Sequence, residues 1–432
     1  PMSRIVYQLL LAVAYPLVRL LLIWRARRET EYAQRVAERF GHVGADLPRG
    51  AVWFHTVSAG ATIAAVPLIR TLAEEFSDLP FLVTTMTPTG SAQVREHLAN
   101  CVAHCYAPYD FRRGVERFFN RMQPRLLVLM ETELWPNLID AAHARGVPVM
   151  VINARLSARS ARGYARIGGL TRNMLNKLSF IACQYPDHAQ RFLDLGADPS
   201  RVSALGSVKF DVALPTDFSA RVEHLRRQFA LGDRPVWVAG STHPGEEEIV
   251  IAAHARLLAI HPQACLLLVP RHPARADSVE TLVKSAGLSM VRQSTLSDSV
   301  SAGAAVVLCD SMGQLQYLYG LSQIAFIGGS LVSVGGHNPI EAALCEQPLI
   351  MGPETFNFPD VIAVFTDAGC LFVVADGNAL AARLQHLFGD AAERARLGVA
   401  ARAVVAENVG ASERLLELLR AEIHARGDVG PA

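Results

Sequence analysis

The pattern that most constrains the fold of this chain is an alternation of short, β-branched apolar runs with stretches of helical period. The runs are apolar at successive positions, which is typical of strands buried on both faces of a parallel sheet. They cover residues 52–56, 81–85, 126–130, 147–152 and 202–205, and then 236–239, 265–269, 305–308, 324–327 and 348–351. An alternation that starts twice predicts an α/β protein with two doubly wound domains.

The length of 432 residues also fits two domains. We expect a membrane anchor at residues 2–28, a first Rossmann-like domain at 29–208, a hinge at 209–234 and a second Rossmann-like domain at 235–432. Whether the last helix packs back on the first domain stays open. Ligands of such folds lie at the carboxyl ends of the strands, which is where we look for functional residues.

The amino terminus is apolar from residue 5 to residue 24, about the length that spans a bilayer. Arg25, Arg27 and Arg28 follow at once, which favours a cytoplasmic location for the rest of the chain. At 100° per residue, the polar residues of this segment form one narrow stripe, namely Arg4, Gln8, Tyr15 and Arg19. Such a stripe suits an anchor that lies in the interface or packs its polar side on protein. The alternative is the first helix of a soluble bundle.

Charge and cysteine content exclude several classes of function. The net charge is +1, which argues against a nucleic-acid partner. The seven cysteines include no C-x-x-C pair, so we interpret them as buried free thiols in a reducing compartment. No D-x-D pair occurs anywhere, so the two-carboxylate metal clamp of metal-dependent sugar transferases is missing. We therefore expect no metal and no cofactor.

The second half carries a glycine-rich loop that follows a strand and opens a helix. It contains Gly336, His337, Asn338 and Glu341, where Asn338 is a good N-cap and Glu341 is able to accept hydrogen bonds from ribose hydroxyls. Helix capping alone would also explain Asn338 and Glu341. Because glycines expose backbone N–H groups, we favour a nucleotide phosphate site here. Arg271 ends another strand, and its guanidinium matches a phosphate in a fork geometry; the alternative is a surface turn.

Two charged segments stand out in the first half. Glu131 and Glu133 follow the apolar run 126–130, so we expect carboxylates at the ligand edge; the alternative is that one of them caps the next helix. The arginines Arg155, Arg159, Arg162 and Arg166 are spaced so that one helix face would carry all four. No acid lies between Asp140 and Asp187, which favours anionic lipid or an anionic acceptor over a solvated face.

The motifs together resemble the Kdo transferase family, which transfers 3-deoxy-D-manno-oct-2-ulosonic acid (Kdo) from CMP-Kdo to a lipid A precursor. The resemblance covers nearly the whole chain. It is carried by His55-Thr-Val-Ser-Ala-Gly60, Thr84-Thr-Met-Thr-Pro-Thr-Gly90, Met130-Glu-Thr-Glu-Leu-Trp-Pro-Asn137, Asn153-Ala-Arg-Leu-Ser157, Gly206-Ser-Val-Lys-Phe-Asp211, Ser241-Thr-His243, Pro270-Arg-His-Pro273 and Gly335-Gly-His-Asn338.

The resemblance implies a GT-B fold with two domains across a cleft, and an inverting, metal-independent transfer at the bacterial inner membrane. It places CMP contacts on residues of the second domain: Pro270, Arg271, Met312, Gly313, Gln314, Asn338 and Glu341. It assigns stabilisation of the transition state to Glu131 and Lys209. Gln314 departs mildly from the family, in which glutamate is frequent at that place.

Ala61 departs from the family more seriously. After Ser58-x-Gly60 the family carries a glutamate that is the proposed general base, and alanine has no proton acceptor. We interpret Ala61 as a replacement that impairs an otherwise complete transferase. Two alternatives stay open: a non-catalytic relative that binds a lipid A precursor or other anionic lipid, and another nucleotide-sugar transferase of GT-B type.

Overall fold

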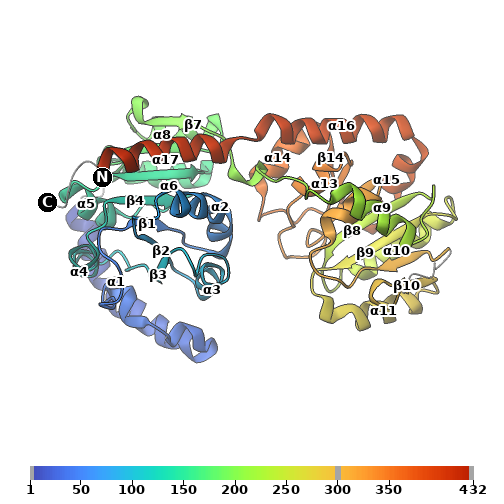
Figure 1. Cartoon of the computed structure of the whole chain (residues 1–432), viewed down its shortest axis with the longest axis horizontal. Helices are drawn as coiled ribbons and strands as arrows, with labels where there is room; N and C mark the ends of the chain where they lie inside the picture. Colours follow the sequence, from blue (N-terminus) through green and yellow to red (C-terminus); the bar gives the residue numbers. More distant parts are fainter. Residues whose placement is uncertain (1–3, 297–302, 428–432) are drawn as a thin grey trace. The chain divides into compact units, whose positions relative to one another are not determined.

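The structure, a computed structural model, describes residues 4–296 and 303–427. Its backbone contacts divide the chain into two compact units, which are described separately (Figure 1). Unit 1 is Pro1–Asp211 with Val409–Ala432, and unit 2 is Val212–Asn408. The segment 209–234, expected to be a hinge, contains α9 (Phe218–Gln228), which packs against α12 (Leu315–Leu321) inside unit 2.

Unit 1 is built on a parallel sheet in the order β3-β2-β1-β4-β5-β6-β7. The strands are β1 (Val52–His55), β2 (Phe81–Thr85), β3 (Ala103–Tyr106), β4 (Leu126–Met130), β5 (Val149–Ala154), β6 (Phe180–Cys183) and β7 (Val202–Ala204). The chain runs outward from β1 to β3 and then returns to β4 on the other side of β1. The topological switch of this sheet therefore lies between β1 and β4.

Helices cover both faces of this sheet, as expected for a doubly wound domain. One face packs against α2 (Ala59–Glu75), α3 (Pro88–His97) and α17 (Ala411–Gly427), and the other against α4 (Arg112–Met122), α5 (Pro136–Ala144), α7 (Gly168–Leu175) and α8 (Pro186–Asp194). The remaining helices are α1 (Arg4–Arg28), α6 (Ala158–Arg166) and the short turns η1 (Thr30–Ala33), η2 (Val36–Phe40), η3 (Pro199–Arg201) and η4 (Val208–Phe210).

The last helix, α17, belongs to unit 1 although it follows the whole of unit 2 (Figure 1). Its apolar side, including Leu415 and Leu419, is buried in the same core as Ala65 and Leu68 of α2. Its amino terminus is held by Asp211, whose carboxylate accepts the N–H groups of Gly410 and Ser412, each at 2.5 Å. The carboxyl-terminal helix thus completes one face of the first sheet.

Unit 2 repeats the architecture in the order β10-β11-β9-β8-β12-β13-β14. The strands are β8 (Val236–Thr242), β9 (Cys265–Pro270), β10 (Met290–Arg292), β11 (Val306–Leu308), β12 (Ile324–Ile327), β13 (Leu349–Met351) and β14 (Leu371–Val373). The helices are α9, α10 (Glu247–Leu258), α11 (Ala276–Ser285), α12, α13 (Ile340–Leu344), α14 (Pro359–Asp367), α15 (Gly377–Gly389) and α16 (Ala391–Asn408), with η5 (Pro273–Arg275) and η6 (Gln293–Thr295). The predicted class, two doubly wound parallel sheets, is confirmed, and the switch point of this sheet lies between β8 and β12.

Candidate functional site

The switch point of unit 1 carries Ala61 in the first turn of α2. Ser58 is the N-cap of this helix, and its Oγ accepts the N–H of Ala61 at 3.3 Å. The side chain of Ala61 is 4% exposed and packs in the core beneath the sheet edge. Ala61 is the third helical residue, the place at which a glutamate forms a capping box with an N-cap serine. A glutamate here would therefore have a structural use, beside the role of general base that the family resemblance implies.

Glu131 lies across the same switch point, directly after β4. Its backbone φ is +62°, a left-handed conformation that costs energy for a residue other than glycine, and strained residues of this kind cluster at functional sites. Its N–H donates to the carbonyl of Ile152 at 3.0 Å, and its carboxylate lies 3.5 Å from Nε of Arg155. The sheet therefore holds a carboxylate at the predicted edge, and that carboxylate is paired with an arginine.

Lys209 lies in η4 and is partly buried. The N–H of the preceding Val208 donates to Oδ1 of Asn153 at 3.3 Å, which ties η4 to the end of β5. Asn153 itself has φ +49° and accepts the amide of Gln184 through its carbonyl at 2.9 Å. Because β5 is the neighbour of β4, η4 and the Glu131 turn stand at the same edge of the sheet.

Glu133 does not cap the helix that follows it. Its carboxylate accepts the indole N–H of Trp135 at 2.9 Å, and burial raises its pKa above the usual value. The first amides of α5, those of Asn137 and Leu138, donate instead to the carboxylate of Asp110 at 2.9 and 2.8 Å.

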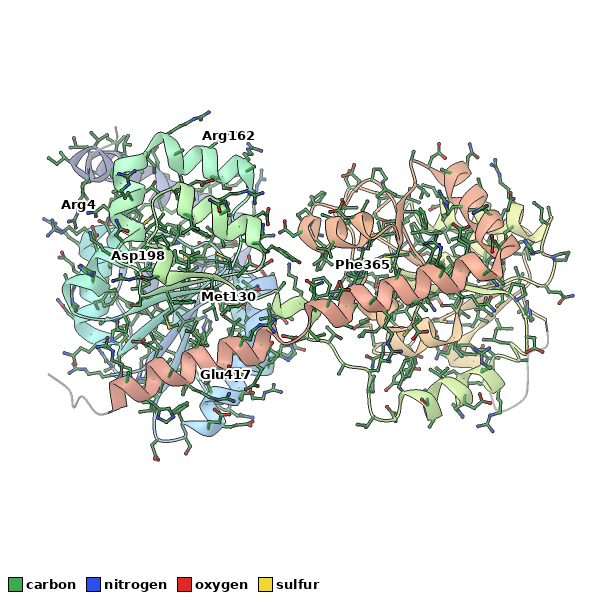
Figure 2. The ribbon with its side chains drawn as sticks, turned by 90° about the horizontal axis from the view of Figure 1, so that it is seen from above. Arg4, Met130, Arg162, Asp198, Phe365 and Glu417 are labelled. Carbon is green, nitrogen blue, oxygen red and sulfur yellow. The ribbon has the colours of Figure 1, made fainter. Side chains whose placement is uncertain are left out.

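The predicted arginine face is correct for three residues and wrong for the fourth. Helix α6 begins at Ala158 because Ser157 caps it, its Oγ accepting the N–H of Ser160 at 3.1 Å. Arg155 therefore precedes the helix and pairs with Glu131. The other three are exposed on α6, and within residues 4–296 and 303–427 none of them has an ion pair; Arg162 lies at the outer surface of unit 1 (Figure 2). These three are Arg159, Arg162 and Arg166.

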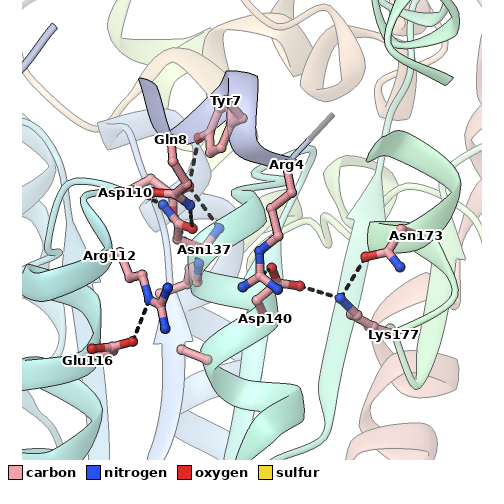
Figure 3. Close-up of polar contacts among 12 residues, drawn as sticks. Arg4, Tyr7, Gln8, Asp110, Arg112, Glu116, Asn137, Asp140, Asn173 and Lys177 are labelled. Atoms are coloured by element: carbon pink, nitrogen blue, oxygen red, sulfur yellow. Dashed lines mark hydrogen bonds and ion pairs between the residues drawn. The ribbon is translucent and has the colours of Figure 1, made fainter. Parts of the chain in front are cut away.

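Helix α1 packs its polar stripe on unit 1, as the sequence suggested. Arg4 pairs with Asp140 at 2.7 Å, Gln8 donates to Asn137, and the hydroxyl of Tyr7 donates to Asp110 at 2.7 Å (Figure 3). Further along, the ring of Tyr15 packs edge-on against Phe40 and Phe111, and Arg19 lies over both Tyr15 and Phe40. The apolar side is exposed, and α1 is long and apolar enough to cross a membrane.

In unit 2, all of the predicted donor-site residues lie at the carboxyl edge of the sheet. Pro270 ends β9 and Arg271 follows it, the segment 312–314 follows β11, and the segment 336–341 follows β12. The N–H of Arg271 donates to the carbonyl of Thr242 at 2.9 Å, and its side chain is exposed. The side chain of Gln314 is already engaged, because its Oε1 accepts a hydrogen bond from the guanidinium of Arg221 at 3.2 Å. Met312 and Gly313 are exposed beside it.

The loop after β12 is held by Glu246, a residue that the sequence did not single out. Its buried carboxylate accepts the N–H groups of Gly329 at 2.7 Å, of Ser330 and Leu331 at 3.0 Å each, and of His243 at 3.2 Å. The amides of Gly336 and His337 donate to backbone carbonyls of the same loop. Acceptors within the chain therefore already take the amides of Gly328, Gly329 and Gly336, so these three are not bare for a phosphate as the sequence suggested.

The side chains of this loop present a different surface. Nε2 of His337 lies 2.8 Å from Nε2 of His243, with the two rings parallel, and burial lowers the pKa of His337 to about 4. Oδ1 of Asn338 accepts the N–H of Ile340 at 3.1 Å, but the N-cap of α13 is Pro339, so the helix begins one residue later than predicted and Asn338 lies just before its cap. Glu341 has no hydrogen bond or ion pair within the described residues, and burial raises its pKa.

No group of three or more His, Cys, Asp or Glu side chains in the described part of the chain is arranged to hold a metal ion. The cysteines in those segments are unpaired, as expected, and most of them are buried.

Comparisons with known proteins agree with the motifs. Residues 34–212 match the family model described as 3-deoxy-D-manno-octulosonic-acid transferase (kdotransferase). The chain is 40% identical over 423 residues to the 3-deoxy-D-manno-octulosonic acid transferase of Haemophilus influenzae, covering 97% of this chain and 98% of that protein. It is 37% identical over 430 residues to the Bordetella pertussis protein of the same name, covering 97% and 99%.

Solved structures of low identity show the fold alone. UDP-GlcNAc 2-epimerase from Neisseria meningitidis aligns with a TM-score of 0.55 at 14% identity, over 86% of this chain and 100% of its own. A glycosyltransferase from Rickettsia africae aligns with a TM-score of 0.52 at 13% identity, over 86% and 99%. The GT-B-type fold expected from the sequence is thus confirmed, and the near-complete match to two transferases establishes that this chain belongs to the Kdo transferase family.

Proposed function

We propose that this protein is an inverting, metal-independent glycosyltransferase that moves Kdo from CMP-Kdo to a lipid A precursor, lipid IVA. The observation that carries the proposal is the identity of 40% to a protein named as a Kdo transferase, which extends over both units rather than over one. The donor then belongs to unit 2 and the acceptor chemistry to unit 1.

The edge of unit 2 suits CMP without a metal. Arg271 offers an exposed guanidinium at the end of β9, and such a group forms two parallel hydrogen bonds with a phosphate. Glu341 is partly desolvated and without a partner among the described residues, so accepting ribose hydroxyls would stabilise its carboxylate. Because CMP leaves as a phosphate monoester, positive charge at Arg271 would stabilise the charge that develops on the leaving group.

The edge of unit 1 suits the activation of a sugar hydroxyl. A base in the first turn of α2 would take the proton of the attacking hydroxyl, and Glu131 and Lys209 would stabilise the developing charges. Ala61 occupies the position of the base, so we propose that this chain binds both substrates and transfers slowly.

The amino-terminal helix suits a cytoplasmic protein held at the inner membrane. Contacts to unit 1 are spread from Arg4 to Arg19, whereas a spanning helix would leave the roughly 30 Å of its length that crosses the hydrocarbon to the lipid. We therefore place α1 in the interface, with its apolar side in the lipid and its polar stripe on the protein.

Calorimetry with CMP in EDTA tests the donor site. Binding should persist in EDTA, and Arg271→Ala should weaken it by about 1.5–3 kcal/mol, the usual cost of a lost charged hydrogen bond. Arg396→Ala, an exposed arginine of the same unit, is the matched control. Affinity that disappears in EDTA would exclude the metal-independent site.

A second candidate is a non-catalytic protein that binds a lipid A precursor or related anionic lipid, and Ala61 is the observation that favours it. Phosphorylated lipid that copurifies with a protein lacking CMP affinity would support this reading.

A further inference from the structure

Unit 1 contains a cavity of about 280 Å³ next to the Glu131 turn. Its walls are Tyr7 of α1, residues 132–136 after β4, and four side chains of α6, α7 and the residue between them, namely Tyr164, Ile167, Leu170 and Met174. The lining is largely apolar, with Leu134, Ile167, Leu170 and Met174 among its members. Its one acid, Glu133, is hydrogen-bonded to the Trp135 indole rather than unpaired.

We propose that this cavity binds a hydrocarbon chain of the lipid acceptor while the sugar of that acceptor lies at the Glu131 edge. The proposal rests on the proposed function and adds to it a binding site for one part of the substrate. Small-molecule sites are typically apolar cavities of this kind, with few polar groups that fix orientation.

The first argument is that the cavity shares a wall with the membrane helix. Tyr7 lines the cavity, and Leu10, one turn further along α1, is apolar and 55% exposed. An apolar face of this kind lies among acyl chains when α1 is in the interface. A chain that leaves the membrane beside α1 therefore passes from one apolar surface to another without crossing water.

The second argument is that the cavity lies directly beside Glu131, the residue that we propose to act on the acceptor sugar. Over residues 131–135 the chain passes from the Glu131–Arg155 pair to Trp135, and the hydroxyl of Thr132 donates to the carbonyl of Arg155. One short turn thus offers charged groups at one end and an apolar wall at the other. An amphipathic ligand with a polar head and an acyl chain matches that order.

The third argument is charge. Helix α6 supplies Tyr164 to the cavity, and its outer side carries Arg159, Arg162 and Arg166, which are exposed. Exposed arginines near a membrane attract phosphorylated headgroups. The occupant is therefore an acyl chain attached to an anionic head, as in the acceptor, and not a neutral lipid.

Quenching of Trp135 tests the site directly. The probe is a lysophosphatidic acid with a brominated twelve-carbon chain, used below its micelle concentration on full-length Trp24→Phe protein, which removes the tryptophan of α1. Saturable quenching is expected, and Trp135→Phe should abolish it. Each CH₂ removed from the chain should weaken binding about fourfold, the equivalent of about 0.8 kcal/mol.

Variants of the wall give the second readout. Ile167→Glu should weaken binding of the probe by at least about tenfold. Leu170→Phe narrows the cavity but keeps it apolar, and it should also weaken binding of the probe. Ile260→Glu, an exposed isoleucine of unit 2, should change nothing. Unlabelled acceptor should compete with the probe and phosphatidylcholine should not. Equal affinity of wild type and both wall variants, or displacement by phosphatidylcholine, would overturn the proposal.

A transfer assay in the Ala61→Glu background separates this proposal from the proposed function. Ile167→Glu should raise KM for the acylated acceptor and leave a deacylated acceptor unaffected. If the KM for the acylated acceptor is the same with and without Ile167→Glu, the proposed acyl-chain site is overturned, while the proposed transferase activity stands. Saturable probe binding with no transfer would support the cavity and overturn the enzyme.

Discussion

The carboxylate of Glu246 accepts the N–H of Gly329 at 2.7 Å, although 83 residues separate the two in the sequence. The same carboxylate accepts three further amides, so it joins the loops that follow β8 and β12 at the switch point of unit 2. Gly328 lies in the same junction, where a Cβ would approach the carbonyl of Ser241 to 2.5 Å. The loops that we propose to bind the donor are thus held in position by a buried acid whose carboxylate oxygens accept backbone amides.

Glu246→Gln should weaken CMP binding by about tenfold or more and lower stability by about 1–3 kcal/mol. The amide NH₂ of glutamine would face backbone donors, which leaves buried N–H groups unsatisfied. Calorimetry measures the first effect and thermal denaturation the second. Glu248→Gln, exposed on the same helix, is the matched control. Lower stability with unchanged CMP affinity would show that this loop is no part of the nucleotide site.

His254 is expected to make unit 2 sensitive to acid. Trp237 donates its indole N–H to Nδ1 at 3.0 Å, and Nε2 faces the carbonyl of Ala305 at 2.9 Å, so the ring is held neutral with the proton on Nε2. Burial lowers the pKa of His254 to about 4. As the pH falls from about 6.5 towards 4, this histidine becomes protonated in the unfolded chain but stays neutral in the folded chain. The free energy of unfolding therefore falls by up to about 3 kcal/mol.

Thermal denaturation from pH 7 to pH 4.5 tests this acid sensitivity. His254→Gln should be less stable at neutral pH, since it loses two buried contacts, but its midpoint should fall less steeply with acid. His97→Gln, an exposed histidine of unit 1, should keep the slope of the parent. If the midpoints of the parent and of His254→Gln fall equally steeply with pH, His254 is not the source of the acid sensitivity.

The arginines of α6 should decide lipid preference. Arg159→Glu together with Arg162→Glu should lower binding to vesicles with anionic lipid by at least about tenfold, since each arginine near such a surface contributes about 1 kcal/mol. The loss should shrink at high salt and be small on neutral vesicles. Cosedimentation measures it, and the matched control reverses Arg396 and Arg402, two exposed arginines of α16. Equal losses in both double variants would exclude a specific basic face.

The runs of apolar residues in the sequence predicted the interior strands of the two sheets well and most of the edge strands poorly. The runs at 81–85, 126–130 and 324–327 coincide with β2, β4 and β12, because these strands are buried and uniformly apolar. The strands that were not predicted are short or carry polar residues, such as β3 with His104 and the outermost β10 and β14. A strand at the edge of a sheet has less need of apolar side chains, so its signal is weak.

The candidate site shows the same limit. The positions of Glu131, Arg271 and Glu341 at one edge of their sheets were predicted from the ends of the apolar runs. The prediction worked because the carboxyl ends of parallel strands lie at the same edge of a sheet. Glu246 could not be found in this way, since three of the four amides that it accepts are 83 to 85 residues away and only the folded sheet brings them together. Arg155 was misplaced because helical spacing continued through Ser157, and a capping serine at that position was the available signal.

The last prediction concerns Ala61. Ala61→Glu should raise the rate of Kdo transfer by about 10²–10⁴-fold, the usual contribution of a general base. CMP affinity should change little, because Ala61 belongs to unit 1 and the donor residues to unit 2. The measurement is a transferase assay with CMP-Kdo and a tetra-acylated lipid A precursor, combined with calorimetry for CMP.

Ala61→Gln separates the two uses that a glutamate has at this position. Both side chains satisfy a capping box with Ser58, so both should stabilise the start of α2 to a similar degree. Only glutamate accepts a proton, so only Ala61→Glu should restore turnover. Equal turnover of the Gln and Glu forms would mean that the residue acts through the helix start alone, and that the base is another group at this edge, with Glu131 and Glu133 as the next candidates.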